Sequence, residues 1–112
     1  MKFTYALTGL TVLATSATQV LAIINAGNTS QYYVAWIYGD NACEWEWVAN
    51  IGDSLCTNSF DPGDGNTYQF KFCGTDKFAL YNGDGSFNSD CIYTNPTYDC
   101  PPQNSVTQTW QC

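Results

Sequence analysis

The 112-residue sequence contains no histidine and no arginine, and three lysines are its only basic residues against ten acidic ones. Without imidazole, histidine-based triads and histidine-containing zinc sites are excluded. Without a guanidinium fork or a basic face, the chain lacks the groups that bind nucleic-acid phosphates. We therefore expect no nucleic-acid partner.

A long uninterrupted apolar run is also missing. Lys2 precedes a short apolar segment at residues 6–14, and small residues lead to a cleavage site after Ala22, with a second candidate cut after Ala17. A membrane span needs about 20 predominantly apolar residues, whereas threonine, serine and glutamine interrupt this segment. We predict a signal peptide over residues 1–22, a secreted, extracellular product and no membrane span.

Removing 22 of the 112 residues leaves 90, with two lysines, ten carboxylates and a net charge of −8. A chain of this length forms one domain, and small secreted domains often rely on disulfides because their cores are marginal. We predict a single disulfide-rich domain over residues 23–112 that exists as a monomer.

Six cysteines, all within residues 23–112, predict three disulfide bonds in an oxidising compartment. They are Cys43, Cys56, Cys73, Cys91, Cys100 and Cys112. Fifteen pairings exist, and the ease of closing short loops favours joining neighbours along the chain. The preferred pairing is therefore Cys43–Cys56, Cys73–Cys91 and Cys100–Cys112. A thiolate metal site is disfavoured because no CxxC pair is present.

Helical periodicity is scarce after the signal segment, and the composition favours strands and turns. Strands are expected at residues 23–24, 31–38, 43–48, 67–72, 78–81, 91–93 and 106–110. Prolines mark a loop before the last of them, and Asn82-Gly83 marks a hairpin. These signals predict an all-β fold, a small disulfide-stapled β-sandwich or barrel of about 6–7 short antiparallel strands.

Three of these segments have informative faces. Residues 31–38 (QYYVAWIY) are apolar on both faces, which suggests a central strand or one exposed binding face. Residues 43–48 alternate, so Cys43, Trp45 and Trp47 should share one side and pack around a disulfide. Residues 67–72 also alternate, which places Phe72 inward beside its apolar neighbours.

Candidate catalytic and metal sites are weak. Glu44 and Glu46 would lie about 7 Å apart on one strand, within the range of glycosidase pairs, but the same spacing is typical of a solvated face. Oxygen-bearing side chains alternate over residues 82–90, yet Phe87 and Tyr93 stand where an EF-hand needs glycine and glutamate. We interpret residues 82–90 as a hairpin turn and expect no catalytic residue, no metal and no cofactor.

Aromatic residues are the most suggestive feature, since aromatic rings stack on sugars and anchor protein interfaces. Tyr32, Trp36 and Tyr38 are the predicted ligand-binding residues, because the side chains of this segment cannot all point inward. Asn28 begins an N-glycosylation sequon, Asn-Thr-Ser, and is a candidate glycosylation site.

The chain combines a short signal with about 90 further residues. These residues include six cysteines and many aromatic, Asn and Gly residues. This combination resembles the small secreted cysteine-rich proteins of filamentous fungi. Many proteins of that group are regarded as effectors that act on a host or on competing microbes. The resemblance implies a virulence or competition factor, and the lack of catalytic groups favours one that acts by binding a host or competitor protein. The alternative is a lectin-like module that binds cell-wall glycan through exposed Trp and Tyr.

Overall fold

The computed structural model describes residues 23–112, so the predicted signal peptide lies outside the described residues. Strands account for nearly all of the regular structure, as predicted. In chain order the elements are β1 (Ile24–Asn28), β2 (Tyr32–Ile37), a 3-10 turn η3 (Ala42–Glu44), β3 (Glu46–Asn50), β4 (Tyr68–Lys71), β5 (Ala79–Asn82), β6 (Phe87–Asp90), β7 (Ile92–Tyr93), β8 (Thr97–Tyr98) and β9 (Val106–Gln111). Two strands are not indicated by the sequence pattern. They are β6, which lies in the segment 82–90 interpreted as a hairpin turn, and the short β8 inside the proline-containing loop.

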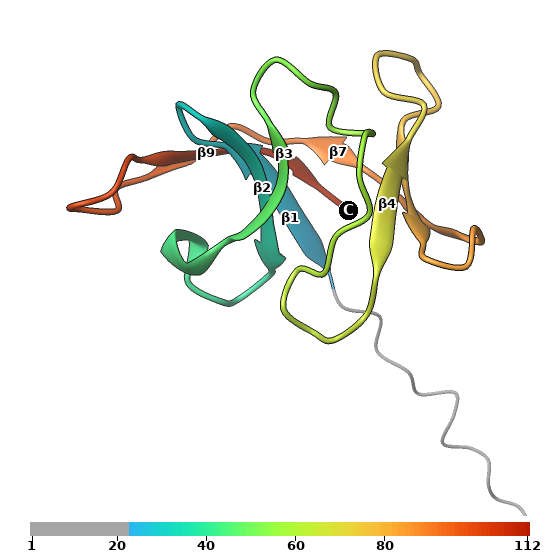
Figure 1. The fold of residues 1–112 in the computed structure, drawn as a ribbon, viewed down its shortest axis with the longest axis horizontal. Helices are drawn as coiled ribbons and strands as arrows, with labels where there is room; N and C mark the ends of the chain where they lie inside the picture. The colour runs from blue at the N-terminus through green and yellow to red at the C-terminus, as the bar shows by residue number, and fades with distance from the viewer. Residues whose placement is uncertain (1–22) are drawn as a thin grey trace, which may run out of the picture.

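Two antiparallel sheets contain these strands (Figure 1). The large sheet has the order β3-β2-β1-β9-β7, with β8 also paired to β9, and the small sheet has the order β4-β5-β6. The first and last long strands, β1 and β9, are neighbours at the centre of the large sheet. Their register shifts at Gly27, where an added Cβ would lie 2.1 Å from the Thr107 carbonyl oxygen. Only glycine therefore fits this bulge.

The main core lies between the two sheets. Its buried members come from both sheets and from the loop before β4, and they are Ile24, Ala26, Ala35, Val48, Ala49, Phe60, Tyr68, Phe70 and Leu80. Phe60, Phe70 and Phe78 stack in sequence, with ring centroids 5.1 and 5.4 Å apart. Aromatic rings supply much of the buried area because the chain is small.

A second core covers part of the opposite face of the large sheet. Val34 and Trp36 of β2 pack there with Ala42, Cys100 and Val106. Ala35 of β2 lies in the main core, whereas Val34 and Trp36 lie in the second core. Both faces of β2 are therefore buried. The prediction of a central strand at residues 31–38 is confirmed.

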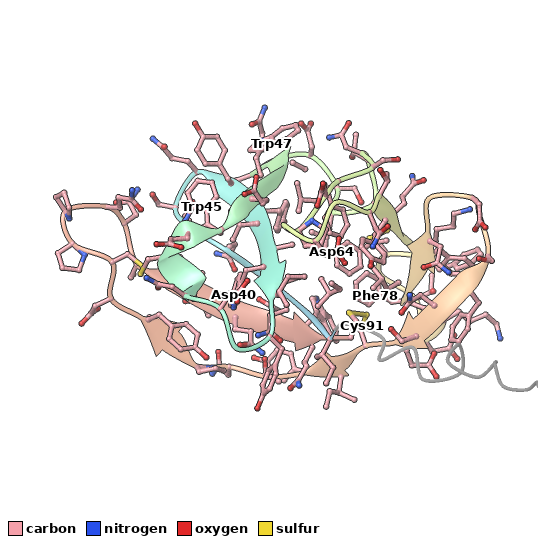
Figure 2. The ribbon with its side chains drawn as sticks, turned by 90° about the horizontal axis from the view of Figure 1, so that it is seen from below. Asp40, Trp45, Trp47, Asp64, Phe78 and Cys91 are labelled. Atoms are coloured by element: carbon pink, nitrogen blue, oxygen red, sulfur yellow. A yellow bond between two sulfur atoms is a disulfide. The ribbon has the colours of Figure 1, made fainter. Side chains whose placement is uncertain are left out.

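The expected strand at residues 43–48 is wrong over its first half. Asn41 caps a 3-10 turn, its side chain accepting a 2.9 Å hydrogen bond from the Cys43 N–H, and β3 begins only at Glu46. Cys43 and Trp45 still pack in the second core, but Trp47 is 45% exposed and donates to the Asn50 side chain. Figure 2 shows Trp47 at the outer rim of the molecule. The 3-10 turn interrupts the alternation that was expected to place Cys43, Trp45 and Trp47 on one side.

Three disulfides are present, as predicted, but the preferred pairing is wrong. The bonds are Cys43–Cys100, Cys56–Cys73 and Cys91–Cys112, which span 57, 17 and 21 residues. Loop closure favours near neighbours in an unfolded chain, whereas the fold places η3 beside residue 100 in the second core. Chain entropy assigns the longest bridge about 4 kcal/mol and each of the others about 3 kcal/mol.

Disulfide bonding of all six cysteines is consistent with an extracellular protein, because such bonds persist in oxidising compartments. No helix within residues 23–112 is long and apolar enough to cross a membrane.

Candidate functional site

The predicted binding residues Tyr32, Trp36 and Tyr38 do not form one exposed row. Tyr38, just past β2, is 60% exposed, whereas Trp36 is only 2% exposed. Tyr32 is half-buried, and its ring packs against Trp45 with centroids 5.9 Å apart. Any ligand stacked on this segment would therefore meet Tyr38 first. The binding role of these three residues stays a prediction.

Trp36 and Tyr38 line a cleft of about 520 Å³ on the outer face of the large sheet, which we call the amide cleft. Its floor includes a row across three strands, in which Asn25 of β1 pairs with Trp36 of β2 and with Gln111 of β9. The connection after β2 and the segment around β8 form its walls. The lining residues are Asn25, Trp36, Tyr38, Gly39, Asp40, Ala42, Thr94, Pro96, Tyr98, Gln108 and Gln111.

Two amide side chains of the cleft are almost fully buried. Asn25 is 4% exposed and Gln108 is 5% exposed. The Tyr98 hydroxyl donates to Gln108 Oε1 at 3.3 Å, and Gln108 Nε2 donates to Asn25 Oδ1 at 3.5 Å. Both distances exceed the usual 2.7–3.0 Å or so of hydroxyl and amide donors. Thr94 Oγ1 is also buried and has no hydrogen-bond partner among residues 23–112.

A second surface feature lies on the outer face of the small sheet. We call it the aromatic patch, and it consists of Phe72, Tyr81 and Phe87. Tyr81 is central, with its ring 5.9 Å from Phe72 and 5.7 Å from Phe87 at interplanar angles of 67° and 87°. Phe72 is 51% exposed and Phe87 is 55% exposed. Lys71 Nζ lies 5.1 Å from the centre of the Tyr81 ring, within cation–π distance.

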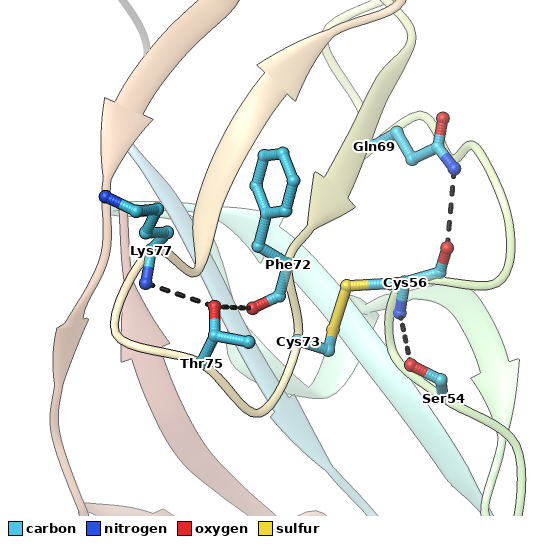
Figure 3. The surroundings of a disulfide bond; sticks show 7 residues. All are labelled: Ser54, Cys56, Gln69, Phe72, Cys73, Thr75 and Lys77. Carbon is cyan, nitrogen blue, oxygen red and sulfur yellow. Dashed lines mark hydrogen bonds between the residues drawn. A yellow bond between two sulfur atoms is a disulfide. The ribbon is translucent and has the colours of Figure 1, made fainter.

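The exposure of Phe72 overturns the expectation that it points inward. Its φ is +61°, so the chain leaves the extended conformation directly after β4 and the alternation of residues 67–72 ends. The Thr75 hydroxyl donates to the Phe72 carbonyl oxygen at 2.7 Å, and the next residue, Cys73, is bonded to Cys56 (Figure 3). The turn and the disulfide together hold an aromatic residue in a conformation that is uncommon for it.

The hairpin at residues 82–90 uses its oxygen-bearing side chains within itself. Asp84 Oδ1 accepts from both the hydroxyl and the N–H of Ser86, at 2.6 and 2.9 Å. These hydrogen bonds, the hydroxyl first, lower the pKa of Asp84. Asn88 Nδ2 donates to Asn82 Oδ1, and Asn82 Nδ2 donates to the Ser86 hydroxyl. The arrangement is that of a turn, and residues 23–112 contain no cluster of three or more acidic or cysteine side chains placed to hold a metal ion.

The Asp61–Asn66 turn is organised in a similar way and adds one partly buried contact. The Tyr68 hydroxyl donates to Asp64 Oδ2 at 2.7 Å. Burial of Tyr68, together with this hydrogen bond, raises the pKa of Tyr68 to about 12. Tyr68 belongs to the main core, so the bond joins the turn to the packing between the sheets.

The two carboxylates considered for catalysis do not share a strand. Glu44 lies in η3 and Glu46 is the first residue of β3, and both are exposed. Neither lines the amide cleft.

Asn28, the candidate glycosylation site, ends β1 and lines a groove of about 600 Å³ that includes Tyr33, Phe78 and Trp110. Thr29, the middle residue of the sequon, is buried and its hydroxyl accepts from the backbone of the β1–β2 turn. Glycosylation of Asn28 stays a prediction.

No family model, curated protein or solved structure matches this chain.

Sequence reasoning missed most residues of these features. Asn25 carried a usable signal because it is an amide between the apolar residues Ile24 and Ala26. Gln108 shares the alternation of the buried Val106. Phe87 was also accessible to reasoning, since it faces Tyr81 across the hairpin. Phe72 had no such signal, because its alternation predicted the opposite face.

Proposed function

We propose that this protein is a secreted, non-catalytic, effector-like factor that binds a protein of a host or of a competing organism. The aromatic patch carries this proposal. Large exposed aromatic clusters on a small monomeric domain are typical of interaction sites, and aromatic residues dominate binding energy in protein interfaces.

The shape of the patch favours a protein over a flat ligand. Tyr81 meets each of its neighbours nearly edge to face, so the three rings do not share one plane. A sugar polymer stacks best on coplanar rings, whereas knobs of differing orientation suit the pockets of a protein surface. The proposed partner therefore offers apolar pockets that receive Phe72 and Phe87.

Charge supports the proposal and narrows the partner. Residues 23–112 carry ten carboxylates but only two lysines, Lys71 and Lys77, and Lys71 covers Tyr81 in the patch. The patch therefore carries one of the two lysines of a strongly acidic domain. A partner with basic groups around its apolar pockets would be attracted to this acidic domain at low salt, and the patch would then supply the apolar contact.

The absence of histidine and the exposure of Glu44 and Glu46 outside the amide cleft support a non-catalytic role. Recognition alone would then account for the activity of the protein.

The test uses the oxidised protein, residues 23–112, immobilised and exposed to protein extracts of candidate hosts and competing microbes. Phe87→Ser removes an exposed ring from an edge strand without opening the core, and Trp47→Ser removes an exposed ring elsewhere. We expect at least one protein of the extract to bind the wild type and Trp47→Ser but not Phe87→Ser. The interaction must then be reproduced with the purified partner.

If every retained protein also binds Phe87→Ser with unchanged affinity, the aromatic patch is not the binding surface and the proposal fails.

A further inference from the structure

The amide cleft is separate from the aromatic patch and has a different chemistry. It lies on the outer face of the large sheet, whereas the patch lies on the small sheet. Its lining combines three aromatic rings (Trp36, Tyr38 and Tyr98) with three carboxamides (Asn25, Gln108 and Gln111). Small-molecule sites typically combine apolar walls with a few convergent polar groups, and their volumes are similar to that of the amide cleft.

The hydrogen bonds of the buried amides in the floor are long. Gln108 and Asn25 are joined by a contact of 3.5 Å, and the Tyr98 hydroxyl reaches Gln108 at 3.3 Å. Thr94 Oγ1 adds a buried hydroxyl without a partner among the described residues. Buried polar groups normally form good hydrogen bonds, and those that do not call for an explanation. A ligand that both donates and accepts would complete this set, as hydroxyl groups do.

The aromatic rings provide the complementary apolar contact. Tyr98 meets Trp36 edge to face, with centroids 6.2 Å apart at 87°. Tyr38 stands 60% exposed at the edge of the cleft. Its ring is free to cover the apolar C–H face of a ligand whose polar edge reaches the amides.

Charge limits the ligand further. Asp40 is the one acidic residue in the lining, and the lining contains no lysine. Phosphorylated, sulfated and carboxylated ligands would meet repulsion without a compensating cation. We propose that the amide cleft binds a neutral saccharide, with the hydroxyls of one sugar unit on Asn25, Gln108 and Thr94 and with Tyr38 stacked on its ring.

The probes are neutral hexasaccharides of four linkage types, namely chitohexaose, cellohexaose, laminarihexaose and mannohexaose. Binding to the oxidised protein is measured by calorimetry and by the NMR shifts of the Trp36 indole. Insoluble chitin, cellulose and β-glucan form a second arm, which distinguishes a polymer ligand from a soluble glycan. We expect one hexasaccharide to bind and to shift the Trp36 signal.

Tyr38→Ala is the main variant because the exposed ring can be removed without disturbing the core, and Trp47→Ala is the matched control outside the cleft. Loss of one stacked ring should weaken binding about tenfold in Tyr38→Ala and leave Trp47→Ala unchanged. Absence of binding by all four hexasaccharides and the polymers, or equal affinity of Tyr38→Ala and wild type, would overturn the proposal. Neither result bears on the aromatic patch, whose test uses Phe87.

Discussion

Phe72 and Tyr81 lie edge to face on the outside of the small sheet, with ring centroids 5.9 Å apart, although Phe72 directly follows a strand whose alternation points it inward. The contact exists because Phe72 has a φ of +61°. A non-glycine residue in this region is energetically unfavourable. The chain therefore accepts local strain at a position that supplies an exposed aromatic ring.

Replacing Phe72 by glycine tests this relationship. Glycine adopts positive φ without a Cβ penalty, so Phe72→Gly should leave the free energy of unfolding unchanged or raise it by up to about 1 kcal/mol. The same variant should weaken the interaction proposed for the aromatic patch. Denaturant unfolding measures the first effect, with Phe72→Ala as the control that retains the strain. A loss of stability in Phe72→Gly relative to Phe72→Ala would contradict the strain argument.

Gly27 should tolerate no side chain. An alanine Cβ there would lie 2.1 Å from the Thr107 carbonyl oxygen and force β1 and β9 apart. We expect Gly27→Ala to lower the free energy of unfolding by about 3 kcal/mol, the upper end for overpacking. Gly39→Ala is the control, because Gly39 has a φ of +93° but nothing within 4 Å of the added atom. It should cost only about 1 kcal/mol, as read from thermal or denaturant unfolding.

The disulfide pairing is directly measurable. Proteolysis without reduction, followed by mass spectrometry, should yield linked peptides that contain Cys43 with Cys100, Cys56 with Cys73 and Cys91 with Cys112. Replacing both Cys43 and Cys100 by serine should cost the most stability, about 4 kcal/mol, because this bridge closes the longest loop. A peptide linking Cys43 to Cys56 would refute the second core as described.

Tyr68 should titrate at a higher pH than a free tyrosine side chain. Its pKa is raised to about 12, first by burial and then by its hydrogen bond to Asp64. The folded state holds this proton more tightly than the unfolded chain, whose tyrosine pKa is about 10. The resulting stability is complete below about pH 10 and falls as the pH rises toward 12.

Spectrophotometric titration at 295 nm follows this group, and Asp64→Asn is the informative variant. It removes the negative charge beside the hydroxyl, so the Tyr68 pKa should fall while staying above that of an exposed tyrosine, because burial is the larger cause. An unchanged pKa in Asp64→Asn would contradict the contact between the two side chains.

Local patterns in the sequence determined the class of fold and the places of most strands. Alternation and turn residues indicated β2, β4, β5, β9 and the hairpin after β5, because each signal acts within a few residues of the chain. The two apolar faces of residues 31–38 indicated either a central strand or one exposed binding face, and the two cores of the structure decided for the central strand. Six cysteines indicated three bridges.

The tertiary structure alone decided the pairing of those cysteines, the direction of Phe72 and the assembly of the amide cleft. Asn25 and Gln108 are 83 residues apart in sequence, and Cys43 and Cys100 are 57 apart. Contacts over such separations depend on which strands become neighbours in the sheets. Local propensity carries no information about which strands pair. That pairing is decided by the packing that buries both faces of the large sheet.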